Sequence, residues 1–349
     1  MIDPDLITAV NRRLAQHQKW LRDKTNGQRA SLAELNLSGY DLHGMDLREA
    51  DLSRAVLDST DLDEADLKGC DLSGARLRHA RLEKACLREA DLYQADLAGA
   101  KLCGADLRET DLRQTRLYQA DLSEANLQEL KLRGIRLSGV QLYGANLCMA
   151  DLQRADLHEC RMRNVNLNGA NLYQANLHDA ELSFAKLRDA NLYGANLRDA
   201  YLDRADLRAA QLCRADLSAA RLEDADLRGA NLSEAVLWGA DLTGVNLQGA
   251  SLSGLKLGNG REVMTVQMRC CQVVYTAEVM VMQCKQYPLA QWWAFDDADI
   301  AALLTDDGLA WWLVYKPLLK AWIAANPAVA TGHEGEQALA TEGCTLAQD

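Results

Sequence analysis

Residues 171–200 read NLYQANLHDAELSFAKLRDANLYGANLRDA, and this stretch contains the pattern that decides the fold. Leu occupies every fifth position, Ala precedes it by two residues, and Asp or Asn mostly stands between them. The pattern runs from Leu32 to Leu257 without insertion over 46 positions, with Met162 as the one exception. Ala stands two residues before the repeated position in 32 of these 46 cases. Self-similarity of this length makes a repeat architecture the first hypothesis.

A period of five residues fits neither a straight helix nor a straight strand. Five helical steps of about 100° rotate a Leu stripe by roughly 140° per repeat, and an odd period moves the Leu to the opposite face of a strand each time. The chain must therefore bend once per repeat, with Ala and Leu pointing inward. Asp and Asn suit the bend because their side chains hydrogen-bond to nearby backbone and tolerate unusual dihedral angles. Successive bends predict a solenoid with a stacked Ala and Leu interior.

The consensus Ala-(Asp/Asn)-Leu-x-x, as in ADLRE, ANLYG and ADLSE, closely resembles that of the pentapeptide-repeat family over about two thirds of the chain. The resemblance implies an all-β solenoid: a right-handed quadrilateral β-helix with about four repeats per coil and about 11 coils. Its narrow interior leaves no room for a small-molecule cavity, so we expect neither an enzyme nor a cofactor.

Inward positions that depart from Ala indicate where the solenoid changes. Large residues near its two ends are expected to plug the open coils; they are Leu35, Tyr40, Met45 and Leu255. Leu130, Ile135 and Val140 are consecutive inward positions, so the coil stack either widens or bends there or simply repacks. Cys70 and Cys160 are expected to be small buried hydrophobes.

The flanking segments divide the chain into four expected parts. Residues 1–29 form an N-terminal capping helix (amphipathic over 3–24), 30–257 the β-helix, 258–327 an α+β module, and 328–349 a disordered tail. The module is expected to contain strands at 263–268, 272–275 and 278–282 and helices at 298–304 and 307–325. Its segment VVYTAEVMVMQCKQYPLAQWWAFDD is similar to a C-terminal module of phage and prophage pentapeptide-repeat proteins.

Charge and composition exclude several functional classes. The net charge of −12 disfavours direct binding of nucleic acid, and no apolar run reaches the length of a membrane span. The N-terminus lacks a secretory signal pattern, and the ten cysteines contain no CxxC pair. These features favour a cytoplasmic location, although a signal-independent export route would leave no trace in them.

Candidate metal and partner-binding residues each have a structural alternative. His158 and His178 are twenty residues apart and could share a metal, or they could be a solvated pair, which we expect. No nucleophile, base and orienting group assemble in the sequence. Four tryptophans of the C-terminal module, Trp292, Trp293, Trp311 and Trp312, form either its core or a partner surface.

An acidic row bears on the best-known function of the resembled family, the binding of DNA gyrase and topoisomerase IV by DNA mimicry. Asp51, Asp71, Asp91 and Asp111 recur every twenty residues with Tyr93 beside them. Turn chemistry explains the same positions, and residues 30–257 carry only nine net negative charges, far fewer than duplex DNA of similar length.

The sequence therefore predicts a non-enzymatic protein-binding scaffold whose partner is unidentified. Homo-oligomers are expected to form through the C-terminal module. The alternatives are a topoisomerase-binding DNA mimic and an effector delivered into another cell.

Overall fold

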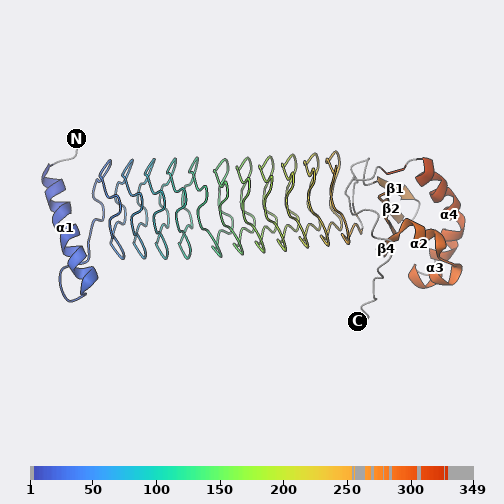
Figure 1. The fold of residues 1–349 in the computed structure, drawn as a ribbon, viewed down its shortest axis with the longest axis horizontal. Coiled ribbons are helices and arrows are strands. Elements are labelled where there is room, and N and C mark those ends of the chain that lie inside the picture. The colour runs from blue at the N-terminus through green and yellow to red at the C-terminus, as the bar shows by residue number, and fades with distance from the viewer. Residues whose placement is uncertain are drawn as a thin grey trace. The chain divides into compact units, whose positions relative to one another are not determined.

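In a computed structural model the chain forms two compact units, Met1–Asn191 and Leu192–Asp349. The structure describes residues 4–253, 255, 264–268, 271–277, 279–282, 285–304, 308–325 and 327–328. The first unit contains helix α1 (Pro4–Arg22) and repeat coils. The second contains further repeat coils, a four-stranded sheet and three helices (Figure 1).

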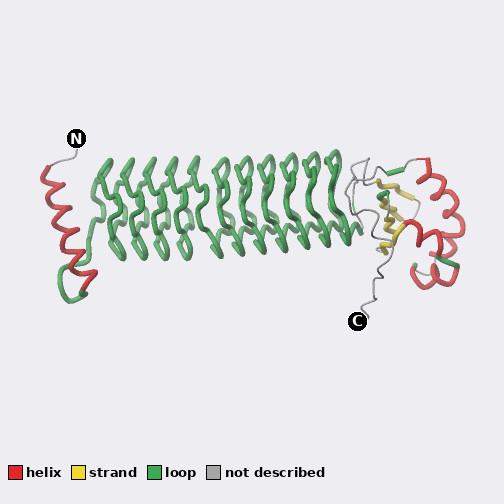
Figure 2. Tube along the Cα trace, in the orientation of Figure 1, coloured by secondary structure: helices red, strands yellow, loops and turns green. Residues whose placement is uncertain are grey.

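Each five-residue repeat forms one bridge and one turn. The bridges are parallel and join residues twenty positions apart, as between Asp51 and Asp71, so each coil contains four repeats (Figure 2). The Leu52 N–H donates to the Asp71 carbonyl at 2.8 Å, and the Ala50 N–H closes a turn on the Leu47 carbonyl at 2.9 Å. Because the inward Leu and Ala side chains are fully buried, the interior is a stacked apolar core. The predicted β-helix solenoid is confirmed.

The corner chemistry differs from the prediction in one respect. Asp71 accepts the N–H of Ser73 through Oδ1 at 2.9 Å, as expected for an Asx turn. The unusual dihedral angle falls three residues later, at Gly74, where φ is +65°. Equivalent positions in other coils hold non-glycine residues, such as Glu49 at φ +61°. Asp and Asn therefore act through their side-chain oxygens, and the following turn contains the left-handed residue.

Helix α1 lies against the first coils of its unit. Its buried face consists of Val10, Leu14 and His17, which recur at helical spacing. The His17 Nδ1 accepts the N–H of Ala30 at 3.1 Å, and Arg13 donates to the Ser31 carbonyl at 2.7 Å. These contacts occupy backbone groups that an open coil end would leave unpaired.

The expected end plugs behave differently from one another. Tyr40 is 8% exposed and its hydroxyl donates to Asn11 of α1 at 2.9 Å. Leu255 is fully buried, whereas Met45 is 38% exposed and therefore plugs nothing.

Helix α1 is followed by Gly27 at φ +85°, where an added Cβ would clash with the Gln16 carbonyl oxygen. Only glycine fits that position.

The C-terminal sheet is an antiparallel meander in the order β1-β2-β3-β4. Its strands are β1 (Met264–Met268), β2 (Cys271–Tyr275), β3 (Val279–Met282) and β4 (Lys285–Pro288). The register places Met264 opposite Tyr275, Val273 opposite Met282 and Met280 opposite Tyr287.

Three helices follow the sheet: α2 (Leu289–Ala294), α3 (Asp297–Leu303) and α4 (Gly308–Ala325). Sequence reasoning missed β4 and α2, because KQYP is polar and ends in proline, and because α2 has only six residues. The expected tail, residues 328–349, lies outside the described residues from residue 329 on.

Tryptophan forms much of the core of this module. Trp292 is fully buried, and its Nε1–H donates to the Met280 carbonyl at 2.7 Å. Trp312 is 1% exposed and lies 5.6 Å from Trp292 between ring centroids. Within the described part of the chain, none of the helices combines the length and hydropathy that a membrane span requires.

A side chain of the sheet ends the last repeat coil. Where coils are paired, the residue before each repeated Leu accepts a Leu N–H from the previous coil and donates to the carbonyl of the inward corner there: Asp51 accepts the Leu32 N–H at 2.7 Å and donates to the Ala30 carbonyl at 2.9 Å. At the last coil the amide of Gln286 in β4 does both. Its Oε1 accepts the Leu252 N–H at 3.0 Å, and its Nε2 donates to the Ala250 carbonyl at 2.6 Å. A glutamine side chain therefore takes the place of one backbone residue of the next coil.

Candidate protein-binding site

The hydrogen-bonded ladder between coils opens at one place in the first unit. No bridge or backbone hydrogen bond joins residues 109–119 to residues 128–138, and the structure describes both segments in full. The bridges that flank them, Asp106 with Asn126 and Asp121 with Gln141, are present. Two of the four sides are parted while the others remain closed. Figure 1 shows wider spacing between successive turns where the colour passes from cyan to green.

Intact coils show what this place lacks. One coil earlier the Leu92 N–H donates to the Asp111 carbonyl at 3.0 Å, and one coil later the Leu132 N–H donates to the Asp151 carbonyl at 2.8 Å. The equivalent N–H of Leu112 has no such partner among the described residues. Backbone groups on the two edges of the opening, which we call its lips (residues 109–119 and 128–138), therefore lack a ladder bond. Unpaired strand edges commonly form such bonds with another chain.

Bulky inward side chains explain the opening. Leu130 and Ile135 replace the usual Ala at two consecutive corners, and a larger side chain in a close-packed interior forces the backbone to move. Of the outcomes that the sequence left open, the structure shows a parting of the coils at these two positions rather than repacking alone. The parting does not extend to Val140, which is fully buried, because the Gln141 N–H bonds the Ala120 carbonyl at 3.2 Å.

Threonine at an inward corner does not open the ladder by itself. Thr60 is fully buried and its Oγ1 donates to the Leu37 carbonyl at 2.9 Å, while the neighbouring bridge between Asp61 and Arg81 is intact. Cys70 and Cys160 use the same kind of bond, from Sγ to Leu47 at 2.8 Å and to Leu137 at 2.7 Å. Burial raises the pKa of each thiol to about 12, so both are inert, as expected.

The opening forms a cleft over two sides of the solenoid. One side has a volume of about 790 Å³ and the other about 730 Å³, and both are lined by Arg113 and Lys131. The apolar wall of the larger part consists of Leu112, Leu117, Leu132 and Ile135. Its basic side chains are Arg78, Arg113, Arg116, Lys131, Arg133 and Arg136, and its acidic ones are Asp96 and Asp156. The larger part is therefore mainly basic at its rim, whereas the smaller part also presents Glu109, Asp111 and Glu129.

The basic side chains of the rim differ in their partners. Arg78 lies 2.8 Å from Asp96, Arg116 lies 3.8 Å from the same carboxylate, and Arg113 lies 2.7 Å from Asp111. The other three, Lys131, Arg133 and Arg136, are exposed and form no ion pair with any described residue. Lys131 and Arg136 stand opposite Asp151 and Asp156 of the next coil without a close ion pair, so the three cations still make this lip locally electropositive.

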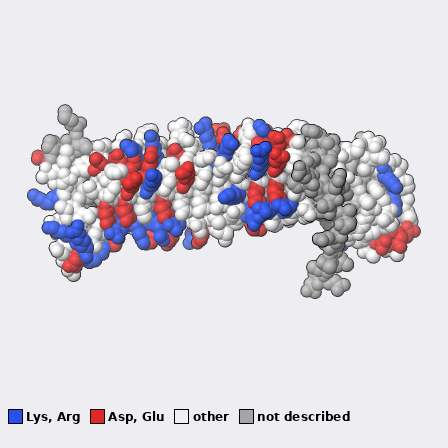
Figure 3. Space-filling model, in the orientation of Figure 1, with Lys and Arg blue, Asp and Glu red and all other residues white. Residues whose placement is uncertain are grey.

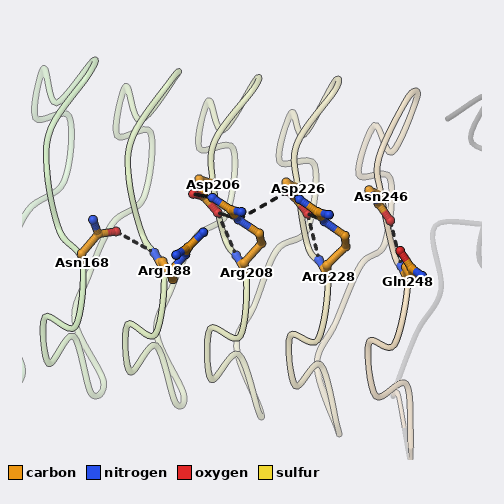
Figure 4. Close-up of polar contacts among 8 residues, drawn as sticks. All are labelled: Asn168, Arg188, Asp206, Arg208, Asp226, Arg228, Asn246 and Gln248. Carbon is orange, nitrogen blue, oxygen red and sulfur yellow. Dashed lines mark hydrogen bonds and ion pairs between the residues drawn. The ribbon is translucent and has the colours of Figure 1, made fainter. Parts of the chain in front are cut away.

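The surface elsewhere in each unit mixes both signs (Figure 3). Arg81 lies 3.4 Å from Asp61 and Arg161 lies 4.0 Å from Glu181, both across neighbouring coils as predicted. In Figure 4, Asp206 pairs with Arg208, which also reaches Asp226 on the next coil at 3.5 Å. Such exposed pairs add little stability, but they neutralise charge.

The predicted acidic row is stacked as expected. Asp51, Asp71, Asp91 and Asp111 bridge in sequence, and each Oδ1 accepts a backbone N–H two residues on, at 2.8–3.1 Å. The Arg113 guanidinium hydrogen bonds lower the pKa of Asp111, and Arg113 lies 5.8 Å from the Tyr93 ring. These contacts support the turn explanation of the row.

The two candidate metal ligands have other partners. His178 Nδ1 lies 2.8 Å from Asp179 Oδ2, and His158 Nδ1 lies 2.7 Å from Asp156 Oδ1. Among the residues that the structure describes, no group of three or more His, Cys, Asp or Glu side chains could hold a metal ion.

The coil spacing brings together one set that sequence reasoning missed. Ser138 Oγ lies 2.8 Å from His158 Nε2, and the same ring contacts Asp156, so a hydroxyl, a base and an orienting carboxylate are aligned. The expectation that no nucleophile, base and orienting group come together is therefore wrong as far as their distances are concerned. The His158 and Asp156 side chains are each 37% exposed, so water screens the charge interactions that activate buried nucleophiles. The sequence did contain a signal for this contact: Ser138 and His158 are twenty residues apart, and residues at that spacing lie side by side on neighbouring coils.

The candidate tryptophans do not form one surface. Trp292 and Trp312 are core residues, and Trp293 is partly buried and stacked on Trp312 at 6.1 Å. The side chain of Trp311 lies outside the described residues. Among the described residues of this module, the exposed large apolar side chains are on α4: Leu313, Val314, Leu318 and Trp322.

Comparison with known families identifies the repeat. The family model "Pentapeptide repeats" matches eight copies within residues 28–139 and 220–259, and the model "Pentapeptide repeat region" matches residues 135–212. The chain belongs to the pentapeptide-repeat family. The search of curated proteins found no match, and the resemblance of the C-terminal segment to a phage module stays a prediction.

Solved structures include relatives of the repeat segment. HetL, a pentapeptide repeat protein involved in heterocyst differentiation regulation from the cyanobacterium Nostoc sp. strain PCC 7120, is 34% identical; the match covers 68% of this chain and 92% of HetL, with a TM-score of 0.25. Rfr23 from the cyanobacterium Cyanothece 51142 is 35% identical over 34% of this chain and 88% of its own, with a TM-score of 0.16.

The plasmid-mediated fluoroquinolone resistance protein QnrB1 is more distant. It is 19% identical over 64% of this chain and 90% of its own, with a TM-score of 0.28. The family assignment therefore rests on the sequence models and on the identity to HetL.

Proposed function

We propose that this pentapeptide-repeat protein is a non-enzymatic scaffold that binds another protein at the interrupted ladder. The observation that carries the proposal is the pair of backbone edges at residues 109–119 and 128–138, which lack ladder bonds and face a cleft. Unpaired edges bind extended segments of other chains through main-chain hydrogen bonds. A second feature supports it: exposed cations on the same lip have no described partner.

Site-specific photo-crosslinking tests this proposal. Tyr118 lines the cleft and is 65% exposed, and Tyr143 occupies the same position of a closed repeat and is 48% exposed. With a benzophenone amino acid at one position or the other, we expect a discrete adduct from an extract of the source cells at Tyr118 only. Equal adducts at both positions, or none at either, would contradict binding at the cleft.

The non-enzymatic part of the proposal also has a direct test, because Ser138 is aligned with His158. We expect no labelling of Ser138 by a fluorophosphonate probe, since an exposed imidazole and carboxylate activate a hydroxyl poorly. Labelling that is lost in Ser138→Ala and in His158→Gln would show that the scaffold is also an acyl-transfer enzyme.

We also propose that the C-terminal module forms homo-oligomers through α4. Val314, Leu318 and Trp322 recur at i, i+4 and i+8, so their exposed side chains lie on one helix face. An exposed apolar helix face marks an interaction site.

Topoisomerase binding by DNA mimicry is the alternative function. The described acidic row offers it little support, because the Asp oxygens bond the corners and arginines pair across coils. Delivery into another cell and a cytoplasmic location stay predictions.

A further inference from the structure

Resting on the proposed protein-binding function, we infer that the interrupted ladder takes an acidic peptide segment, inserted in extended conformation as an extra strand between residues 109–119 and 128–138. The occupant is a segment of another protein that presents carboxylates at alternate positions. Three features of the cleft specify this class of partner: its backbone edges, its rim charge and its apolar base.

The backbone edges specify the extended conformation. Four N–H groups on one lip, those of Leu112, Gln114, Leu117 and Gln119, lack the bonds that their equivalents make in neighbouring coils. On the opposite lip the N–H groups of Lys131 and Arg136 are likewise without bonds to described residues. Each lip also presents the carbonyl groups that these donors would otherwise bond. An inserted strand therefore finds donors and acceptors on both of its edges.

The charged side chains at the rim of the cleft specify the charge of the inserted segment. Lys131, Arg133 and Arg136 are exposed on one lip and lack described ion-pair partners, whereas the guanidinium of Arg113 on the other lip is held by Asp111. Opposite charges on neighbouring strands attract, and like charges repel. Carboxylates on the outer face of the segment would meet all three cations.

The base of the cleft specifies the side chains of the inserted segment that alternate with its carboxylates. Leu112, Leu117 and Leu132 are at most 3% exposed, and Ile135 beside them is partly exposed. Successive side chains of a strand point to opposite faces. Small aliphatic residues between the acidic ones therefore lie over Ile135, because the three Leu side chains expose almost no surface. The segment bends once, because the two open sides of the coil meet at the turn around Gln114.

A defined peptide tests the inference on the full chain. The probe is an acetylated and amidated decapeptide of alternating Glu and Val with a central Gly-Asn pair, labelled for fluorescence anisotropy. Its matched analogues replace every Glu by Lys, or methylate every second backbone nitrogen. We expect saturable binding of the acidic peptide, with slowed amide exchange at Leu112, Leu117 and Lys131. Neither analogue should bind, because one has the wrong charge and the other cannot pair its edges.

The chain offers a matched pair of charge reversals. Lys131-Leu132-Arg133 on the lip and Lys186-Leu187-Arg188 on a coil outside the cleft have the same sequence and the same place in the repeat. We expect K131E/R133E to weaken peptide binding at least about tenfold and K186E/R188E to change it less than about twofold. A thermal midpoint near that of the native chain shows that each variant is folded.

Each remaining result decides the question. Binding of the N-methylated or the Lys peptide as tight as that of the acidic one would overturn strand insertion. No binding of the acidic peptide, with a protein still cross-linked at Tyr118, would overturn the inference and leave the proposed function. Capture of no protein at all would overturn both. Cross-linking of Tyr118 to a second copy of this chain would replace the acidic partner by a dimer.

Discussion

At the scale of single residues, His17 is the most constrained titratable group of α1. It is fully buried, and because Nδ1 accepts the Ala30 N–H, Nε2 must carry the proton; Nε2 has no hydrogen-bond partner among the described residues. Burial lowers the pKa of His17 below 6.5; Asp46 and the Arg48 backbone oppose this, and Lys24 and Arg29 add to it. Protonation would remove the acceptor for Ala30 and place a charge in the helix contact.

This pKa predicts an acid-sensitive N-terminal helix. A base whose folded-state pKa is depressed contributes stability that is present above pH 6.5 and is lost as the pH falls through the folded-state value. We expect the thermal midpoint to fall more steeply between about pH 7.5 and 5 in the native chain than in His17→Gln. His43→Gln, which changes an exposed histidine, should keep the native slope. Parallel slopes in all three proteins would contradict the assignment.

Gln286 is the single residue that ends the repeat coils of the second unit. Its amide both accepts and donates, so Gln286→Glu keeps an acceptor for Leu252 but sets a carboxylate against the Ala250 carbonyl. We expect this change to destabilise the chain by about 1–3 kcal/mol, the cost of a buried polar group without its partner. Gln248→Glu, the same change at an exposed corner of the same unit, should cost much less. Denaturant unfolding measures both, and equal losses would be contrary to the capping role.

At the scale of the element, the inward corner decides whether two coils pair. Ala fits the corner, Thr and Cys fit it by bonding a carbonyl of the previous coil, and Leu130 with Ile135 do not fit. The bulk of two side chains therefore outweighs several hydrogen bonds, each of which contributes only about 1 kcal/mol net.

Restoring the consensus should close the ladder. Two large-to-Ala changes in a closed core cost about 4–10 kcal/mol together. In Leu130→Ala/Ile135→Ala we expect a loss of less than about 2 kcal/mol, because the new ladder bonds offset the smaller side chains. Amide exchange at Leu112 and Leu117 should slow by more than about tenfold.

The control for this closure is Leu137→Ala/Leu142→Ala, at buried Leu positions in the same coils. It should show the full cavity cost and no slowing of exchange. A loss as large in the corner variant as in this control would mean that the ladder stays open for another reason.

At the scale of the whole molecule, the repeat surface and the C-terminal module predict different behaviour. The carboxylates of the acidic row accept corner N–H groups, and Asp111 also pairs with Arg113, so we expect no inhibition of gyrase supercoiling and no relief from a quinolone at micromolar protein. Either effect, lost on Asp71→Asn/Asp91→Asn, would favour the DNA mimic instead.

The exposed face of α4 predicts self-association. By sedimentation velocity we expect the native chain to be an oligomer that Leu318→Glu converts to monomers, since a buried unpaired charge is costly. Leu252→Glu would unfold a coil, so the suitable control is Val236→Glu, at a partly exposed corner of the same unit. A native chain that sediments as a monomer would refute the prediction.

Sequence determined the part of this protein that depends on a local rule applied many times. A five-residue period excludes the straight helix and the straight strand, and the inward Ala and Leu follow from it, as does the place where Leu130 and Ile135 disturb the stack. Tertiary structure decided what depends on residues far apart in the chain. It brought Ser138 within hydrogen-bond distance of His158, and it bonded the Gln286 amide to the last coil. It also opened two sides of one coil while the others stayed closed. The physical reason is that ladder bonds and side-chain volume compete at each coil, and which one prevails depends on the coils above and below.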